Sequence, residues 1–328
     1  IIALLAVGMV AVMPTARSMD GGMAMSVEPG NGTVGQLELP GESGPGGREV
    51  VDADLSSVLA SDRERLGTTL AVDRFERDFD AAQNRSRRIA TVETALTALE
   101  TRGGELRQAR TDAVHAFNRG ELTRAGLLRE LTRISTAASG LNERADSIET
   151  VIRRSDFSTP PEVAVRLTTV DAELVSLSGP LTERIAEATR ADRQPTRVAI
   201  QTVDGGLTLA AVDGGTYLRE ATLWSARATG GTNEFEADGS SPLVAAHQRA
   251  QTLYPWAFEN LVSNPSISGF GDSTIYPVSL NHAHGELTAY LDGRTTDVFF
   301  EQQELRLSSL PARPVASNQT DGLSLTVA

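Results

Sequence analysis

The chain has 328 residues, with 43 acidic side chains against 30 basic ones, and every base is an arginine because the sequence contains no lysine. This length allows about two domains with tails, and an apolar content of 40% excludes a wholly disordered chain. The absence of cysteine excludes disulfides, thiolate metal sites, a cysteine nucleophile and a lipidated N-terminal cysteine. A net charge of −13 without a basic block argues against nucleic-acid binding.

The excess of acid and the exclusive use of arginine together indicate a protein adapted to high salt. Carboxylates hold water and hydrated cations, and at 1 M salt the Debye length of about 3 Å screens their mutual repulsion. A GC-rich genome would explain the arginines but not the acid excess. We therefore expect a halophilic protein.

The first 17 residues are typical of a secretory signal peptide without its charged beginning. Ile1 to Met13 form an apolar run too short to span a bilayer core of about 30 Å as a helix, and small residues follow at Pro14 to Ala16. The sequence does not distinguish general from twin-arginine export. The predicted location is extracellular or in the cell envelope, with no later run long enough for a membrane span.

An exported protein can be N-glycosylated, and three triplets of the acceptor type begin at Asn31, Asn84 and Asn318. The alternative for each is an unmodified polar turn. Residues 18–49 are rich in Gly, Pro and Ser without a hydrophobic period, so we expect a flexible linker there. Short apolar clusters between Val50 and Leu70 suggest one or two helical turns.

From about Val72 to Arg190 apolar residues recur in steps of three and four, which predicts three amphipathic helices in an antiparallel coiled-coil bundle over residues 50–194. The seam of the first helix is predicted at Phe75, Phe79, Ala82, Ile89, Val92, Leu96, Leu99, Leu106, Ala113 and Phe117. The second seam is Leu127, Leu131, Ile134, Ala138, Leu141, Ala145, Ile148 and Ile152. The third is Val163, Leu167, Val170, Leu174, Leu177, Leu181, Ile185 and Ala188.

Two features should bend these helices. Gly103-Gly104 lies within the first and Pro180 within the third. A first helix continuous over roughly 45 residues would reach almost 70 Å at 1.5 Å per residue, which suits a spacer. Heptad seams can also pair between chains, so a homo-oligomer through the helices is an open alternative.

After Arg197 the period changes to two, and residues 195–312 are predicted to form an α+β domain. Three strands, a helix over Pro242 to Leu261 and three more strands imply one helix on an antiparallel sheet. Residues 313–328 end in a strand that either completes this sheet or opens a further β domain. The fold class is therefore mixed α and β: the three-helix bundle followed by the α+β domain.

Three segments resemble a haloarchaeal family of exported proteins whose domains are catalogued as domains of unknown function. They are Leu253–Phe258, Gly285–Gly293 and Asn318–Leu323. The resemblance implies that an immunoglobulin-like β domain, often with a membrane segment, follows residue 328, and that membrane attachment depends on it. It implies no activity, because the family has none assigned. The hairpin around Asp292-Gly293 also resembles the strand pair of PepSY-type modules, which bind or restrain exported peptidases.

Few residues point to chemistry. His282 and His284 lie on one face of a strand and could hold a metal only with a third ligand, so polar turn residues are the favoured interpretation. Tyr254, Trp256 and Phe258 could form an aromatic binding patch, although packing of the helix onto the sheet is favoured.

The sequence therefore predicts a cell-envelope protein with a structural or protein-interaction role, no catalytic residues and no cofactor. Its partner should be an envelope protein. A PepSY-like regulator that binds an exported peptidase is the first alternative, and an unrecognised hydrolase around His282 and His284 is the second.

Overall fold

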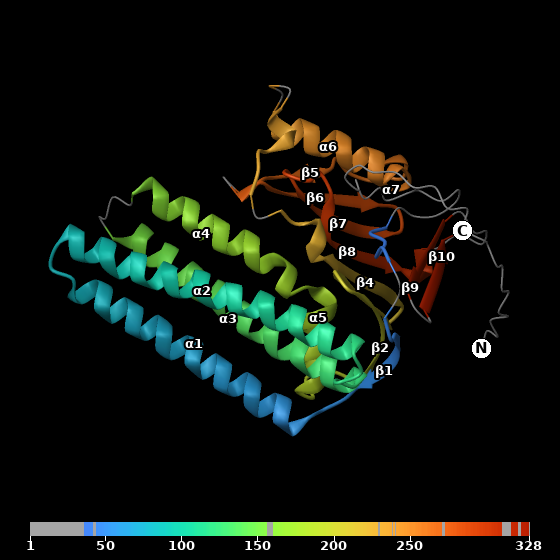
Figure 1. Ribbon diagram of the computed structural model, residues 1–328, viewed down its shortest axis with the longest axis horizontal. Coiled ribbons are helices and arrows are strands. Elements are labelled where there is room, and N and C mark those ends of the chain that lie inside the picture. The colour runs from blue at the N-terminus through green and yellow to red at the C-terminus, as the bar shows by residue number, and fades with distance from the viewer. Residues whose placement is uncertain are drawn as a thin grey trace.

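The computed structural model describes residues 36–327 except 42–43, 156–159, 229, 238, 240, 271–272, 310–315 and 321–322. The predicted signal peptide and Asn31 lie outside these residues. Five helices make an elongated bundle, and a sheet with two smaller helices adjoins one end of it (Figure 1). The helices are α1 (Leu55–Ala81), α2 (Arg85–Asn118), α3 (Arg124–Arg154), α4 (Pro161–Leu174), α5 (Pro180–Thr189), α6 (Pro242–Leu253) and α7 (Pro255–Glu259).

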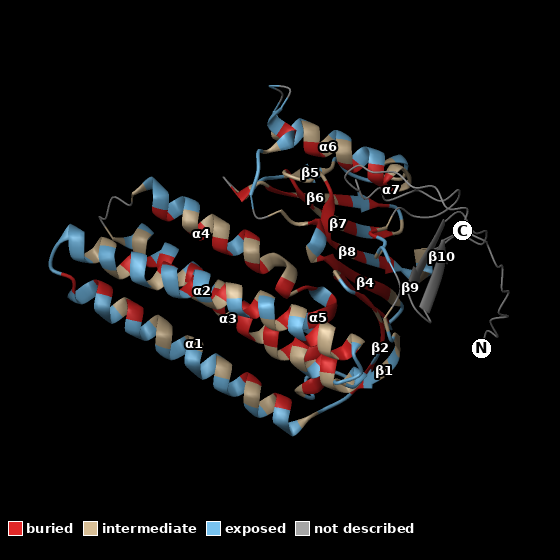
Figure 2. Cartoon of the chain, viewed as in Figure 1, coloured by how far each residue is buried: buried red, intermediate tan, exposed pale blue. Residues whose placement is uncertain are grey.

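The predicted heptad seams form the core of the bundle. Figure 2 shows buried residues along the inner sides of α2 and α3. α3 contacts α1, α2, α4 and α5, and seven of its eight predicted seam residues are buried, while Ile152 is half-buried. Pro180 interrupts the third seam as predicted, since α4 ends at Leu174 and α5 starts at the proline, where the missing N–H costs nothing.

The first predicted helix is in fact two antiparallel helices, and this corrects the expected 70 Å spacer. The chain turns at Ala82 and Gln83, and Asn84 caps α2 by accepting the backbone N–H of Arg87 at 3.0 Å. The apolar period continues across this turn, which is why it concealed the break. The stretch from Val50 to Leu70, expected to hold one or two helical turns, supplies most of α1 instead.

The glycines Gly103-Gly104, where a bend was predicted, do not break the helix, since α2 runs through both of them. Gly103 is buried, and a β-carbon on it would lie 3.4 Å from a methyl carbon of Leu174. That distance is an ordinary van der Waals contact, so the approach of α4 does not require a glycine at this position. Packing of α2 within the bundle outweighs the low helix propensity of the two glycines.

The sheet is larger than the six-stranded one expected. All eight strands are antiparallel, in the order β1-β2-β3-β4-β8-β7-β6-β5. They are β1 (Gly47–Val51), β2 (Thr196–Val203), β3 (Gly206–Asp213), β4 (Thr216–Leu223), β5 (Ser266–Ile267), β6 (Ile275–His282), β7 (Gly285–Asp292) and β8 (Val298–Arg306). β9 (Ala316–Thr320) and β10 (Leu323–Val327) form a separate hairpin, and β9 contacts β2 and β3.

The two added strands come from regions without a clear strand period. β1 spans the end of the predicted linker and the first two residues of the predicted bundle region, and it pairs with β2 so that Glu49 faces Val198. Leu37, further back in the predicted linker, is 3% exposed. The later part of residues 18–49 is therefore packed onto the sheet and is not a free linker. This is not evident from the sequence, because the backbone hydrogen bonds that hold β1 need no hydrophobic repeat.

Helices cover opposite faces of the sheet at its two ends. Side chains of β2, β3 and β4 such as Ile200, Leu209 and Leu218 share a core with α2, α3 and α5. On the other face, α6 and α7 share a core with β6, β7 and β8. Because successive strand residues point to opposite faces, β4 serves both cores. No described helix is long and apolar enough to cross a membrane.

Candidate functional site

Strand β4 carries two buried charged neighbours, Arg219 and Glu220, which are 3% and 6% exposed. Since they alternate along the strand, their side chains serve opposite faces of the sheet. Charged side chains are rarely buried unless they are paired. Each of these two holds a different segment of the chain against the sheet.

Arg219 belongs to a closed network around Glu301 of β8, whose side chain is fully buried. One carboxylate oxygen of Glu301 accepts Arg219 Nη1 at 2.6 Å and Gln303 Nε2 at 3.2 Å. The other accepts the Tyr254 hydroxyl and the backbone N–H of Leu37, both at 2.7 Å. Arg219 Nη2 also donates to the Leu37 carbonyl at 2.7 Å. The network thus fixes the segment at Leu37 on the face covered by α6 and α7.

Burial dominates the ionisation of this network. It raises the pKa of Glu301, while Arg219 and the hydroxyl of Tyr254 oppose that rise. Burial beside Glu301 also raises the pKa of Tyr254 well above its usual range, so the hydroxyl stays protonated and donates. A carboxylate that accepts four donors within a closed core is suited to holding a segment in place, not to proton transfer with a substrate.

Glu220 points to the other face and caps α5. Its carboxylate accepts the backbone N–H groups of Leu181 at 2.5 Å and Thr182 at 3.3 Å, and the Thr182 hydroxyl at 2.6 Å. The N–H groups in the first turn of a helix have no acceptor within that helix, and the helix dipole favours a negative charge at this end. Burial raises the pKa of Glu220, and the three hydrogen bonds oppose that rise.

A third set of charges links the bundle to the sheet further along. Glu173 of α4 accepts Arg227 Nη2 at 2.6 Å and is also bonded by Arg107 of α2. Arg227 Nε lies 3.5 Å from the fully buried carboxylate of Asp292 on β7, and its guanidinium lies 4.8 Å from the ring centre of Phe299. Helices α2 and α4 are thereby tied to β7 and β8.

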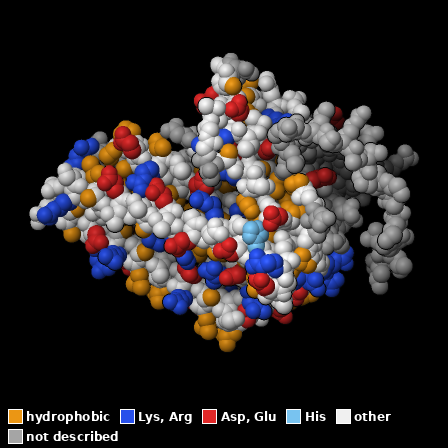
Figure 3. All heavy atoms as spheres, in the orientation of Figure 1, with side chains coloured by type: hydrophobic (Ala, Val, Ile, Leu, Met, Phe, Trp, Pro, Cys, Tyr) orange, Lys and Arg blue, Asp and Glu red, His pale blue; other side chains and the backbone are white. Residues whose placement is uncertain are grey.

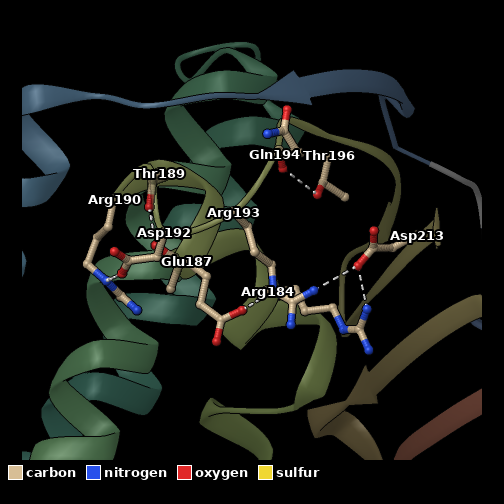
Figure 4. Close-up of polar contacts among 10 residues, drawn as sticks. Arg184, Glu187, Thr189, Arg190, Asp192, Arg193, Gln194, Thr196 and Asp213 are labelled. Atoms are coloured by element: carbon tan, nitrogen blue, oxygen red, sulfur yellow. Dashed lines mark hydrogen bonds and ion pairs between the residues drawn. The ribbon is translucent and has the colours of Figure 1, made fainter.

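The chain passes from bundle to sheet through a dense set of ion pairs, drawn in Figure 4. Arg184 of α5 and Arg193 of the connection both reach Asp213 at the end of β3, the latter at 3.3 Å. Arg193 also bonds Glu187, and Arg190 bonds Asp192 at 2.9 Å. The connection is thus fixed to α5 and to β3.

The predicted pair His282 and His284 closes around Trp256 of α7. The ring of His284 stacks on the Trp256 ring at 5.6 Å between centres, and the His282 ring meets it edge-on at 5.1 Å. His284 Nδ1 lies 2.6 Å from the Ser309 carbonyl oxygen. The two imidazoles therefore flank an indole, and no group of three or more His, Asp or Glu side chains in the described residues could hold a metal ion.

His282 is the buried member of this pair, at 1% exposed. Its Nδ1 accepts the backbone N–H of His284 at 3.3 Å, and its Nε2 has no hydrogen-bond partner. Burial, then the neighbouring His284 and Arg306, lower its pKa to about 4. The imidazole is therefore neutral at physiological pH.

The predicted aromatic patch is divided between core and surface. Tyr254 is fully buried and its hydroxyl points inward to Glu301. Trp256 and Phe258 are half-buried and pack against the core under α6 and α7. The favoured interpretation of packing therefore describes Tyr254 entirely and the other two in part.

Two hollows could take a ligand. One of about 340 Å³ lies beside the β6–β7 hairpin and is lined by His282, Glu286, Glu304 and Arg306, among others. The second, of about 770 Å³, is a groove between α1, α2 and α3 lined mainly by small and apolar side chains, with Arg144 at one side. Neither brings together a nucleophile, a base and an oxyanion donor.

Asn84 and Asn318 of the predicted glycosylation triplets lie at an exposed helix cap and on β9. The residues that sequence reasoning missed are Arg219, Glu220 and Glu301. The only signal for Arg219 and Glu220 was a charged pair between apolar residues of β4, and Glu301 had none, because polar residues follow it in β8.

Two family models match the chain. One, described as a domain of unknown function (DUF7096), matches residues 1–194, and the other, a family of unknown function (DUF7094), matches residues 198–311. The first covers more than half of the chain. The chain belongs to the DUF7096 family. Searches of curated proteins and of solved structures gave no match.

The expectation of an uncharacterised two-part family is thus confirmed, and the structure adds how the two parts meet. The DUF7096 region supplies the bundle and also β1, whereas the DUF7094 region supplies most of β2 and the strands β3 to β8. The ion pairs of Figure 4 lie at the boundary between the two matches. Because one sheet contains strands of both, the regions are interlocked.

Proposed function

We propose that this protein is a structural or protein-interaction component of the cell envelope, in which the helical bundle is an arm that presents a partner-binding end at a fixed position from the sheet. The observation that carries the proposal is the way in which the arm is joined to the sheet. Glu220 of the sheet binds the start of α5, Asp292 of the sheet binds Arg227, and β1 pairs with β2. These contacts join the arm to the sheet rigidly. Helices α2, α3 and α5 also share an apolar core with β2, β3 and β4, and an apolar interface opposes independent motion of the two parts.

The length of the arm fits this role. α2 has 34 residues, about 50 Å at 1.5 Å per residue, and the turn between α1 and α2 lies at the end of the bundle remote from the sheet (Figure 1). The acid excess and the apolar run at Ile1 to Met13 support an exported protein in a salty medium.

The hollow beside the β6–β7 hairpin favours a second candidate, a module that binds a peptide segment of an exported peptidase. Glu286, Glu304 and Arg306 could pair with charges of such a segment, and the unpartnered Nε2–H of His282 could donate one hydrogen bond. This second candidate places the partner at the sheet, whereas the first proposal places it at the end of the bundle remote from the sheet.

Photo-crosslinking in a halophilic host separates these two. A photoreactive amino acid at Gln83, at the tip of the arm, should give a reproducible crosslink to one envelope protein in intact cells. The same probe at Val262, beside the hollow, should give none, and it would capture a peptidase if the second candidate holds. Recovery of the protein in the cytoplasmic fraction would contradict both.

A shortened arm tests the spacing directly. Removal of two helical turns, seven residues, from the tip end of each of α1, α2, α3 and α4 keeps the heptad register. The expected result is a folded protein, by circular dichroism in molar salt, that loses the crosslink from the tip. An unchanged crosslink would show that the arm length has no role.

A further inference from the structure

Helix α1 presents a row of leucines to solvent. Leu55, Leu59, Leu66 and Leu70 are 73%, 61%, 61% and 57% exposed. At 3.6 residues per turn they fall within about 60° of the helix circumference. Single exposed leucines are ordinary on protein surfaces, but a stripe of four marks an interaction site.

The stripe faces away from the rest of the molecule. The buried residues of α1 are Ser57, Ser61, Phe75 and Phe79, which lie on the opposite side of the helix. α1 forms the lower border of the bundle in Figure 1, and hydrophobic side chains project along the same border in the space-filling view of Figure 3. The stripe therefore lies where a second molecule could reach it without displacing any described element.

Two exposed charges flank the middle of the stripe, one on each side. Asp62 and Arg63 lie about 50° to either side of its centre, and neither forms an ion pair with a described residue. In a parallel pair of helices, the flank of one helix meets the opposite flank of the other. A two-fold axis along α1 would therefore set Asp62 beside the partner's Arg63, and Arg63 beside the partner's Asp62.

We propose that α1 is a self-association surface, through which two copies of this chain form a parallel, two-fold-symmetric helix pair. Each leucine of the stripe meets its own counterpart, and two ion pairs specify the parallel direction. An antiparallel pair would instead place Asp62 beside the partner's Asp62, and Arg63 beside the partner's Arg63, which like-charge repulsion opposes. Beyond Leu70 the stripe continues as Asp73 and Arg77, so the pairing ends there.

Sedimentation equilibrium of the full chain in about 1 M KCl tests the proposal, because hydrophobic pairing survives at a Debye length of about 3 Å. We expect a monomer–dimer equilibrium. The double variant Leu59→Ser, Leu66→Ser should weaken the dimer at least about tenfold, a change of about 1.4 kcal/mol, and leave the circular dichroism spectrum unchanged. A wild-type chain that stays monomeric, or a double variant that dimerises normally, overturns the proposal.

A matched control removes exposed apolar residues elsewhere. Leu243 and Val244 on α6 are 39% and 50% exposed, and the double variant Leu243→Ser, Val244→Ser should dimerise like the wild type. An equal loss of dimer in this control would mean that general surface hydrophobicity, not the stripe, drives association, and it would overturn the proposal.

Charge reversal and crosslinking test the direction. Asp62→Arg and Arg63→Asp should each weaken the dimer at low salt, whereas a mixture of the two variants should restore it. The absence of cysteine allows a clean crosslink, so Leu59→Cys should form a disulfide with the same residue of the partner. A Leu59→Cys chain that crosslinks only with a Leu66→Cys chain would show antiparallel pairing and overturn the proposed arrangement.

Discussion

Helices α5 and α1 are held in opposite ways. α5 has 10 residues, six of them buried, and Glu220 caps its first turn from the sheet. α1 has 27 residues but only four buried ones, and a hollow of about 310 Å³ separates its beginning from α3. The short helix is therefore the more firmly fixed of the two. Helical period and length predict that a helix forms, whereas buried contacts decide how tightly it is held.

The largest expected effect concerns the one firmly packed part of α1. Phe79 is 1% exposed in the bundle core, so Phe79→Ala should lower the free energy of unfolding by about 3 kcal/mol. Urea denaturation in molar KCl would measure this. The control Thr69→Ala, at an exposed position of α1, should change the value by less than about 0.5 kcal/mol. A loss below about 1 kcal/mol for Phe79→Ala would mean that α1 is loosely held along its whole length.

The second-largest expected loss of stability comes from removal of the cap of α5. Glu220→Ala leaves two N–H groups and the Thr182 hydroxyl without their acceptor, so stability should fall by about 2 kcal/mol. Hydrogen exchange should speed up in α5 before it does in α2. Glu286→Ala removes an exposed glutamate from β7, which β8 separates from β4, and is the matched control. Equal losses from both substitutions would refute the role of Glu220 as a cap.

The same substitution, threonine to valine, should change stability in opposite directions at Thr132, beside α1, and at Thr189 of α5. The Thr132 hydroxyl of α3 lines the hollow under α1 and has no hydrogen-bond partner, so Thr132→Val should stabilise the protein by about 1 kcal/mol. On α5, the Thr189 hydroxyl donates to the Ala186 carbonyl at 2.8 Å, and Thr189→Val should cost about 1 kcal/mol. Thermal unfolding of both variants in the same buffer measures the difference. Shifts of the same sign would contradict the contrast between loose and tight packing.

The sequence was informative where a repeat reflects burial on one side. The seam of α3, the break of the third helix at Pro180 and the hairpins of the sheet follow from period and turn residues, and the structure confirms them. The break at Asn84 was missed because the apolar period continues across it. β1 was missed because a five-residue strand of mixed polarity has no period to detect.

The buried charges could not be inferred from one sequence. Arg219 and Glu220 interrupt the apolar pattern of β4, which suggests surface positions until both faces of the strand are known to be covered. Their partners are distant in sequence: Leu181 lies 39 residues from Glu220, and Leu37 lies 182 residues from Arg219. Leu37 and Glu301, which Arg219 joins, are 264 residues apart. Only the three-dimensional fold reveals such pairs, whereas His282 and His284 were noticed from the sequence because only Ala283 separates them.

The smallest expected effect on stability concerns the charge of Asp171, at the contact between α4 and α3. Burial, then Asp146 and Glu149 of α3, raise the pKa of Asp171 to about 6. Because the folded state binds this proton more tightly than the unfolded state, with a pKa of about 3.9, the carboxylate reduces stability above pH 6 and this loss disappears as the pH falls towards 4.

Asp171→Asn should therefore stabilise the protein at pH 7.5 and have no effect near pH 4. Because the side chain is only partly buried and salt screens its neighbours, the gain should stay below about 0.5 kcal/mol, and it should be larger in dilute buffer than in molar KCl. Urea titrations at both pH values and both salt concentrations measure it, with Asp73→Asn on α1 as the control. A gain that is independent of pH would assign the effect to helix propensity instead of charge, and would leave α4 held, like α5, by its buried contacts alone.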